Sequence, residues 1–201
     1  MKVLCLYNNI CALELFEWIK NEGNEVELCS DRIDERWCKD RYFDLTVSYT
    51  YRYILSKGVL NALNDNVVNI HNSFLPYNKG ADPNIWSIID GTPSGVTLHY
   101  LSEKVDAGNI ITQKIVQFDL RDTLKSSYYK LDREAKSMFK EAFGFYRYWE
   151  NIQKKPLGKG SYHTVNDGKR IKELINDYDI LISEFKQLYN NTFGEKSEQS
   201  L

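Results

Sequence analysis

An amide, an imidazole and a carboxylate in one region of the sequence could together transfer an acyl group. Asn69 and His71 stand two residues apart at the end of a predicted strand, so their side chains point to the same face. The amide donates hydrogen bonds, and the imidazole accepts or donates a proton near neutral pH. Asp106 follows in a glycine-terminated turn, from which its carboxylate could hold the tautomer of the imidazole and favour its protonated form. Acyl transfer to an amine needs an oxyanion donor and a proton acceptor, and these side chains supply both.

A structural interpretation of the same residues stays open at this point. A histidine after a strand is commonly a hydrogen-bonded core residue, and Asn-x-His alone is a weak pattern. His99 lies inside another predicted strand, and we interpret it as structural. His163 fits either a position near the binding crevice or a contact between subunits.

The elements that must position these residues alternate between strand and helix. This alternation of strands and helices predicts an α/β fold with a Rossmann-like, doubly wound and mostly parallel sheet. Ligands bind beyond the carboxyl ends of the strands in such sheets, which directs attention to residues 8–9, 49–52 and 71–73. The predicted strands cover residues 2–7, 25–29, 44–49, 66–70, 95–101 and 109–118, with helices near residues 13–20 and 56–63.

The remaining segments predict a helical extension with one hairpin. Asp82 is the predicted N-cap of a short helix with Pro83 at its first position. Apolar residues at three-and-four spacing predict one long helix from Thr123 to about Lys154. The turn-forming residues 166–168 predict a hairpin, and a final helix is expected over about 177–190.

Composition limits the possible classes of function. The 201 residues carry 26 Lys and Arg against 28 Asp and Glu, a net charge of −2 that argues against a nucleic-acid partner. Charged residues make up 27% of the chain. Its first residues have no small-residue cleavage site of a leader peptide, and their apolar run is too short to span a bilayer. We therefore expect a cytoplasmic protein without a membrane partner. Neither the four cysteines nor the three histidines have metal-ligand spacing, so we expect reduced thiols and no metal.

An ordered set of motifs surrounds the three candidate residues and carries a family resemblance. The set resembles the formyltransferases that use N10-formyltetrahydrofolate as their cosubstrate. Upstream, residues 48–54 resemble the folate-contacting loop of that family, and the turn at Asn8-Asn9 resembles its substrate-phosphate loop. The motif residues are Asn69, His71, Ser73, Leu75-Pro76, Gly80, Gly95, Thr97, His99, Asp106 and Gly108.

The amino-acid sequence of the middle segment is similar to that of one branch of the family. Residues 72–80, 83–88 and 91–97 resemble enzymes that act on nucleotide-linked amino sugars in glycan or O-antigen precursor synthesis. The branch that acts on glycinamide ribonucleotide usually has proline where this chain has Asn72. Methionyl-tRNA formyltransferases carry a further domain and a basic surface, which we do not expect here.

The resemblance implies a role for each candidate residue. Asn69 would donate a hydrogen bond to the formyl oxygen, and His71 would act as general base or, as imidazolium, stabilise the oxyanion. Asp106 would orient and charge His71 and help shuttle the proton. Backbone groups near six residues would hold the pterin: Arg52, Tyr53, Ile54, Val105, Ala107 and Gly108. Sugar or pyrophosphate contacts are expected at Asn9, Ser73, Lys79, Asn84 and Trp86, although core packing also fits Trp86 and a solvated charge also fits Lys79.

We expect a catalytic core over residues 1–120 and an extension over residues 121–201 that forms a homodimer interface. The resulting hypothesis is transfer of a formyl group to the amine of a nucleotide-linked amino sugar, with a thymidine-diphosphate 4-amino-4,6-dideoxy sugar as the first candidate. Three alternatives stay open: transfer to glycinamide ribonucleotide, hydrolysis of the formyl folate, and a binding module without activity.

Overall fold

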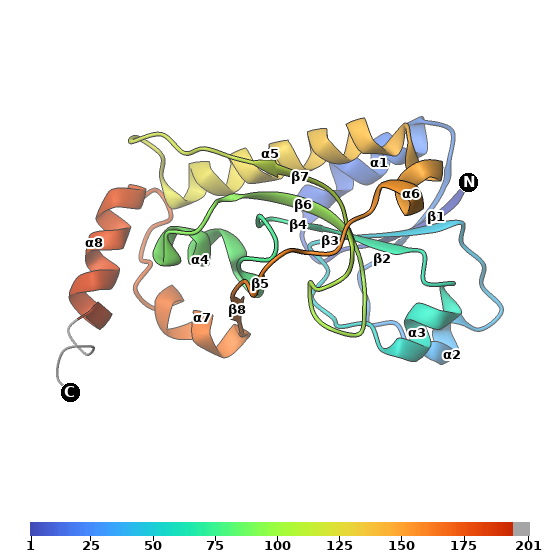
Figure 1. Cartoon of the computed structure of the whole chain (residues 1–201), viewed down its shortest axis with the longest axis horizontal. Helices are drawn as coiled ribbons and strands as arrows, with labels where there is room; N and C mark the ends of the chain where they lie inside the picture. Colours follow the sequence, from blue (N-terminus) through green and yellow to red (C-terminus); the bar gives the residue numbers. More distant parts are fainter. Residues whose placement is uncertain (195–201) are drawn as a thin grey trace.

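Six strands form the central sheet of the computed structural model, which describes residues 1–194 (Figure 1). Neighbouring strands from β2 through β1 and β3 to β4 run parallel, whereas β6 is antiparallel to both β4 and β7. The prediction of an α/β fold with a mostly parallel, Rossmann-like sheet is therefore confirmed. In their order across the sheet, the strands are β2 (Glu25–Cys29), β1 (Lys2–Leu6), β3 (Leu45–Tyr49), β4 (Val67–His71), β6 (Gly95–Tyr100) and β7 (Ile110–Ile115).

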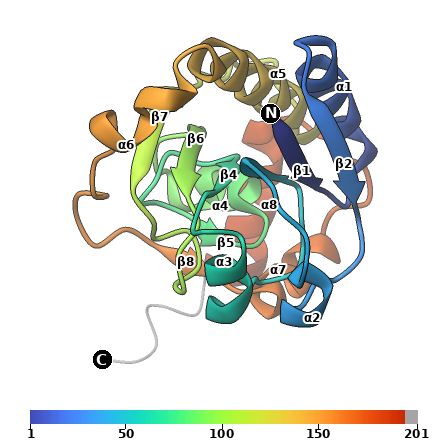
Figure 2. The same cartoon turned by 90° about the vertical axis from the view of Figure 1, so that its right-hand side faces the viewer.

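Helices cover both faces of this sheet. Figure 2 shows α1 (Leu13–Asn21) and α5 (Leu124–Phe143) on one side, and α2 (Glu35–Cys38) and α3 (Lys57–Ala62) on the other. A third apolar cluster joins the N-terminal end of α5 to three further helices. These helices are α4 (Pro83–Asp90), α7 (Val165–Lys172) and α8 (Ile182–Phe193).

Alternation along β4 decides which way the candidate residues face. Val68 and Ile70 pack in the apolar cluster of α1 and α5, whereas Val67 packs in the cluster of α2 and α3. Asn69 and His71 share the second face with Val67, because side chains two residues apart in a strand point the same way. The sequence prediction of a common direction for these two side chains is thus confirmed.

The predicted long helix from Thr123 to Lys154 is wrong in its second half. Helix α5 ends at Phe143, and a 3-10 turn (Tyr146–Tyr148) and the short helix α6 (Trp149–Ile152) follow. The break lets Trp149 turn back into the core, where it is almost completely buried. Its indole N–H donates to the carbonyl oxygen of Ala142 at 3.0 Å, an oxygen at the end of α5 that also accepts from the backbone N–H of Phe145 at 2.9 Å.

The predicted hairpin around residues 166–168 is also wrong, because this segment begins α7. The Thr164 hydroxyl accepts from the backbone N–H of Asp167, and the Asp167 carboxylate accepts from the backbone N–H of Thr164. This reciprocal capping box starts a helix at residues that also fit a turn. Residues just before it form β8 (Tyr162–His163), which pairs in parallel with β5 (Lys79–Gly80).

Two smaller expectations also differ from the structure. Asp82 stands at the N-cap of α4, but its backbone is left-handed and its carboxylate pairs with Lys172 at 2.8 Å instead of capping the helix. The final helix begins at Ile182, later than the expected residue 177.

The division at residue 120 stays a prediction, and the last seven residues of the predicted extension lie outside the described part of the chain. Within residues 1–194, no helix has both the length and the apolar character needed to cross a bilayer.

Candidate active site

Pairing of three adjacent strands places three polar side chains in one row. Ser48 of β3 and His99 of β6 are the register partners of Asn69 on β4. The Ser48 hydroxyl donates to Asn69 Oδ1 at 2.9 Å, and Asn69 Nδ2 lies 3.2 Å from His99 Nε2. Side chains of directly paired residues lie on the same face of a sheet, so the contacts follow from the register. The amide of Asn69 is therefore held from both sides.

His71 lies at the end of β4, and its tautomer is fixed by a carbonyl. Its Nε2 is 3.0 Å from the carbonyl oxygen of Asn78. A carbonyl only accepts hydrogen bonds, so Nε2 carries the hydrogen. In the neutral imidazole, Nδ1 is then the nitrogen that can accept a proton.

Asp106 comes to the two imidazoles from the loop between β6 and β7. Its Oδ2 accepts from the backbone N–H of Gly80 at 2.8 Å and lies 3.7 Å from His71 Nε2, while Oδ1 lies 3.5 Å from His99 Nε2. The side chain is 9% exposed. Its backbone is left-handed, a conformation that aspartate tolerates better than most residues.

Burial by itself raises the pKa of the Asp106 carboxyl. The charge of His71, the neighbouring imidazole of His99 and the hydrogen bond from the backbone N–H of Gly80 outweigh that effect and hold the pKa well below its usual range. Asp106 is thus a carboxylate at neutral pH. It can stabilise a positive charge on the neighbouring imidazole, and it is a poor acceptor for a proton.

A cavity of about 540 Å³ opens at this cluster. Its wall brings together segments that are far apart in the sequence, from the end of β3 to the beginning of α7. Most of the predicted site residues line it: Asn69, His71, Asp106, Arg52, Tyr53, Ile54, Val105 and Asn84. Tyr49 and Asn72, which lie in the segments expected at the carboxyl ends of the strands, also line it. Sequence reasoning missed other wall residues, including Tyr128 and Thr164.

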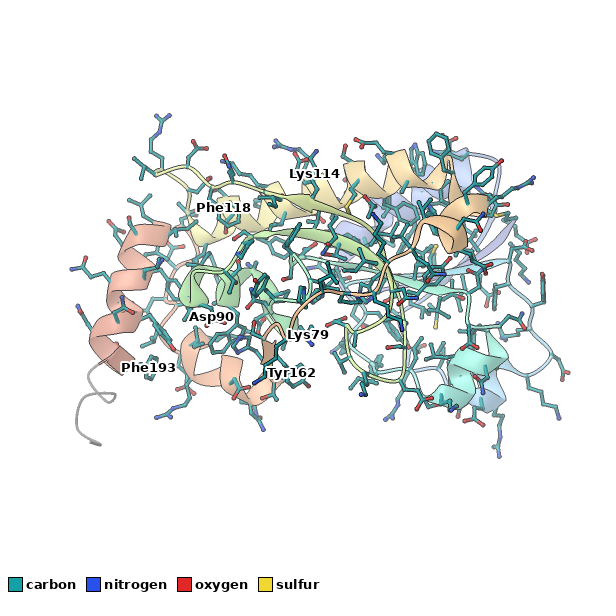
Figure 3. The ribbon with its side chains drawn as sticks, in the orientation of Figure 1. Lys79, Asp90, Lys114, Phe118, Tyr162 and Phe193 are labelled. Carbon is teal, nitrogen blue, oxygen red and sulfur yellow. The ribbon has the colours of Figure 1, made fainter. Side chains whose placement is uncertain are left out.

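Two predicted residues border a different cavity. Lys79 and Ala107 line a smaller space of about 340 Å³, which Asp106 also touches. Lys79 lies beside Tyr162, its register partner in the pair of β5 and β8 (Figure 3). The structure therefore separates Lys79 from the main cavity, whose wall Tyr162 joins.

Asn9 and Ser73 lie outside the wall that the described residues form. Asn9 caps the 3-10 turn Ile10–Ala12, and its amide donates to the hydroxyl of the wall residue Tyr128 at 3.4 Å. Ser73 is completely buried and donates to the carbonyl oxygen of Tyr77 at 2.6 Å. Both side chains thus hold the loops that carry the cavity.

Trp86 and Gly108 also act from behind the wall. Trp86 is mostly buried and stacks on the ring of His163 at 3.8 Å between centroids, which places His163 in the wall. Gly108 is buried against β6, where a Cβ atom would overlap the carbonyl oxygen of Tyr100. The missing side chain lets the loop that carries Asp106 fold back onto the sheet.

His99 is the polar residue whose position the sequence did not reveal. It is completely buried, as expected of a structural residue, but it contacts both Asn69 and Asp106. The spacing within the segment Gly95–Tyr100 gives no hint of this. Only the antiparallel register of β4 and β6 places residue 99 opposite residue 69.

Comparison with known families agrees with this geometry. The family model described as formyl transferase matches residues 29–143, more than half of the 201-residue chain. The chain therefore belongs to the formyl transferase family, and the family resemblance found in the motifs is confirmed.

Individual relatives are similar over different shares of their length. A dTDP-4-amino-4,6-dideoxyglucose formyltransferase of Mycobacterium bovis is 29% identical over 132 residues, covering 66% of this chain and 56% of the relative. The bifunctional polymyxin resistance protein ArnA of Wigglesworthia glossinidia brevipalpis is 39% identical over 89 residues, covering 44% of this chain and 14% of the relative. The chain thus spans less than two thirds of these curated relatives.

One solved structure is similar over nearly its whole length. The formyltransferase PseJ from Anoxybacillus kamchatkensis, in complex with UDP-4,6-dideoxy-4-formamido-L-AltNAc and tetrahydrofolate, is 30% identical with a TM-score of 0.83. The match covers 92% of this chain and 97% of PseJ.

Proposed function

We propose that this protein transfers a formyl group from 10-formyltetrahydrofolate to the primary amine of a nucleotide-linked amino sugar. The observation that carries the proposal is the convergence of Asn69, His71 and Asp106 on one cavity in a chain of this family. The similarity to PseJ, whose structure holds a formamido sugar nucleotide with tetrahydrofolate, supports the class of acceptor.

The walls of the cavity suit both substrates. Aliphatic side chains of Ile54, Leu55, Leu60, Leu101 and Val105 suit the flat pterin ring of the folate. Polar groups of residues 80–84 and 162–165 are available to an acceptor. We therefore assign the donor to the first set of residues and the acceptor to the second.

The cluster supplies the proton and charge chemistry of the transfer. The acceptor amine attacks the formyl carbon and forms a tetrahedral intermediate, whose oxyanion accepts a hydrogen bond from Asn69 Nδ2. His71 takes the proton that the amine loses, and the charged Asp106 stabilises the resulting imidazolium. The intermediate then collapses with cleavage of the bond from carbon to the folate nitrogen. That nitrogen takes up the proton that His71 holds, which returns the imidazole to its neutral form, and tetrahydrofolate leaves.

The finer assignment is a thymidine-diphosphate or UDP-linked 4-amino-4,6-dideoxy sugar, used as a precursor of a glycan such as O-antigen. The names of the mycobacterial relative and of the PseJ complex support this choice.

A cytoplasmic location is part of the proposal, and cysteines 5, 11, 29 and 38, which are free thiols in the described chain, fit it. Pairing into a homodimer through residues 121–201 stays a prediction that sedimentation analysis can test.

An acceptor screen tests the function directly. The protein is mixed with 10-formyltetrahydrofolate and TDP-, UDP- and GDP-linked 3- and 4-amino sugars, and glycinamide ribonucleotide is included as a further acceptor. Mass spectrometry then detects the gain of one formyl group. Formylation of a sugar nucleotide supports the proposal, whereas formylation of the ribonucleotide, release of formate without an acceptor, or no reaction contradicts it.

Two matched variants connect the activity to the cluster. Asp106→Asn removes the charge beside His71, and we expect a loss of turnover with the fold retained. Asp65→Asn is the control, because Asp65 is exposed, lies outside the cavity wall and has the same left-handed backbone as Asp106. Normal turnover by Asp106→Asn would refute the assigned mechanism.

A further inference from the structure

His99 is a buried titratable residue that the chemistry proposed above does not use. It is completely excluded from solvent in β6. Its Nδ1 lies 2.9 Å from the carbonyl oxygen of Tyr100, and its Nε2 lies 3.2 Å from Asn69 Nδ2 and 3.5 Å from Asp106 Oδ1. Both ring nitrogens therefore have neighbours at or near hydrogen-bond distance.

The partners of the ring select one tautomer. The carbonyl of Tyr100 only accepts, so His99 Nδ1 carries a hydrogen and donates it. In the neutral ring, Nε2 is then bare and accepts one hydrogen of the Asn69 amide. The Ser48 hydroxyl donates to Asn69 Oδ1 on the other side, which requires the same orientation of the amide.

We propose that His99 is a positioning residue that fixes the direction of the Asn69 amide. The inference rests on the proposed formyl transfer. With one N–H held by His99 and the carbonyl held by Ser48, the second N–H of Asn69 is left free for the formyl oxygen at the cavity wall.

The direction matters because the two ends of an amide have opposite effects on an oxyanion. A half-turn of the Asn69 amide would place a carbonyl oxygen beside the developing negative charge. Loss of one oxyanion donor costs about 10²–10³-fold in kcat. A neutral amide gains no charge interaction that would hold it in place, so the hydrogen bonds of its neighbours decide its orientation.

The competing role for His99 is a direct effect on Asp106, with the ring doubly protonated. The structure favours the role through Asn69, because the Nε2–Nδ2 distance is 3.2 Å and the distance to Asp106 is 3.5 Å.

Two substitutions of His99 distinguish the role of its Nδ1 from the role of its Nε2. His99→Asn keeps a donor near the Nδ1 position and loses the acceptor near Nε2, whereas His99→Gln places an acceptor near Nε2. We expect His99→Asn to lower kcat about 100-fold, with KM for donor and acceptor changed less than about 3-fold. We expect His99→Gln to stay within about 10-fold of the parent kcat. Equal losses in the two variants would overturn the proposal.

A double-mutant cycle tests whether His99 acts through Asn69. In the Asn69→Ala background, His99→Asn should cause no further loss of kcat, because the amide that it positions is gone. Independent, multiplicative losses would refute the role. Thermal unfolding of each variant identifies any that fails to fold.

A measurement without turnover keeps this inference separate from the proposed function. In ¹⁵N NMR spectra of the parent protein near pH 7, the ring of His99 should show a protonated Nδ1 and a bare Nε2. A doubly protonated ring, or a hydrogen on Nε2 alone, would overturn the inference even if the enzyme is active. Absence of formyl transfer by the parent protein would refute the proposed function, and the NMR result would still decide the tautomer.

Discussion

Substitution of Lys136 tests a buried ion pair that joins α5 to the cavity. Lys136 Nζ lies 2.7 Å from Asp132 Oδ2 one helical turn away, and both side chains are about nine-tenths buried. Asp132 also accepts from the hydroxyl of Tyr49 at 2.6 Å, and Tyr49 belongs to the cavity wall. Lys136→Met would leave the carboxylate buried without its cation.

The expected loss is about 3 to 5 kcal/mol in the free energy of unfolding, because one partner of a buried pair is removed. Lys136 also contacts Glu14 at 2.7 Å, but the Glu14 side chain is 68% exposed. An exposed pair contributes about 0–1 kcal/mol, so Glu14→Gln is the matched control with a small loss.

Urea unfolding followed by circular dichroism measures these free energies. Adding Asp132→Asn to Lys136→Met should recover much of the loss, because the neutral amide oxygen still accepts from Tyr49. The reasoning fails if Lys136→Met costs less than about 1 kcal/mol, or if the double variant is no more stable than the single variant.

Three further predictions follow from the packing and charge of the site. Gly108→Ala should lower both stability and formyl transfer, because the new Cβ would overlap the carbonyl of Tyr100 and displace the loop that carries Asp106; thermal unfolding and steady-state rates would show this. Trp149→Ala should cost about 3 to 5 kcal/mol in urea unfolding, because a fully buried ring is removed from the core. The pKa of Asp106 is lower in the folded chain than in the unfolded chain, so the stability that this carboxylate contributes is present above about pH 4 and is lost on acidification below it. The difference in unfolding free energy between the parent and Asp106→Asn should therefore shrink from about pH 6 to about pH 3, and a constant difference would contradict the assigned pKa direction.

Local pattern determined much of the fold and part of the site. Residues 66–70 predicted a strand, and the side-chain period of two in a strand gave Asn69 and His71 a shared direction, which β4 confirms. The motifs around these residues predicted the family that comparison confirmed. The wrong predictions arose where one local signal fits two structures. Residues 164–168 satisfy a capping box as well as a turn, and the apolar spacing after Phe143 continues although the helix does not.

Contacts between segments far apart in the sequence decided the remaining features of the site. The antiparallel register of β4 and β6 placed His99 against Asn69, and the pairing of β5 with β8 brought His163 into the cavity wall. Asp106 reached the imidazoles because Gly108 allows its loop to approach β6 closely. A sequence read along the chain reports propensity and periodicity, which are local. Strand register and loop packing depend on burial and hydrogen bonds between segments far apart in sequence, so only the tertiary structure could determine them.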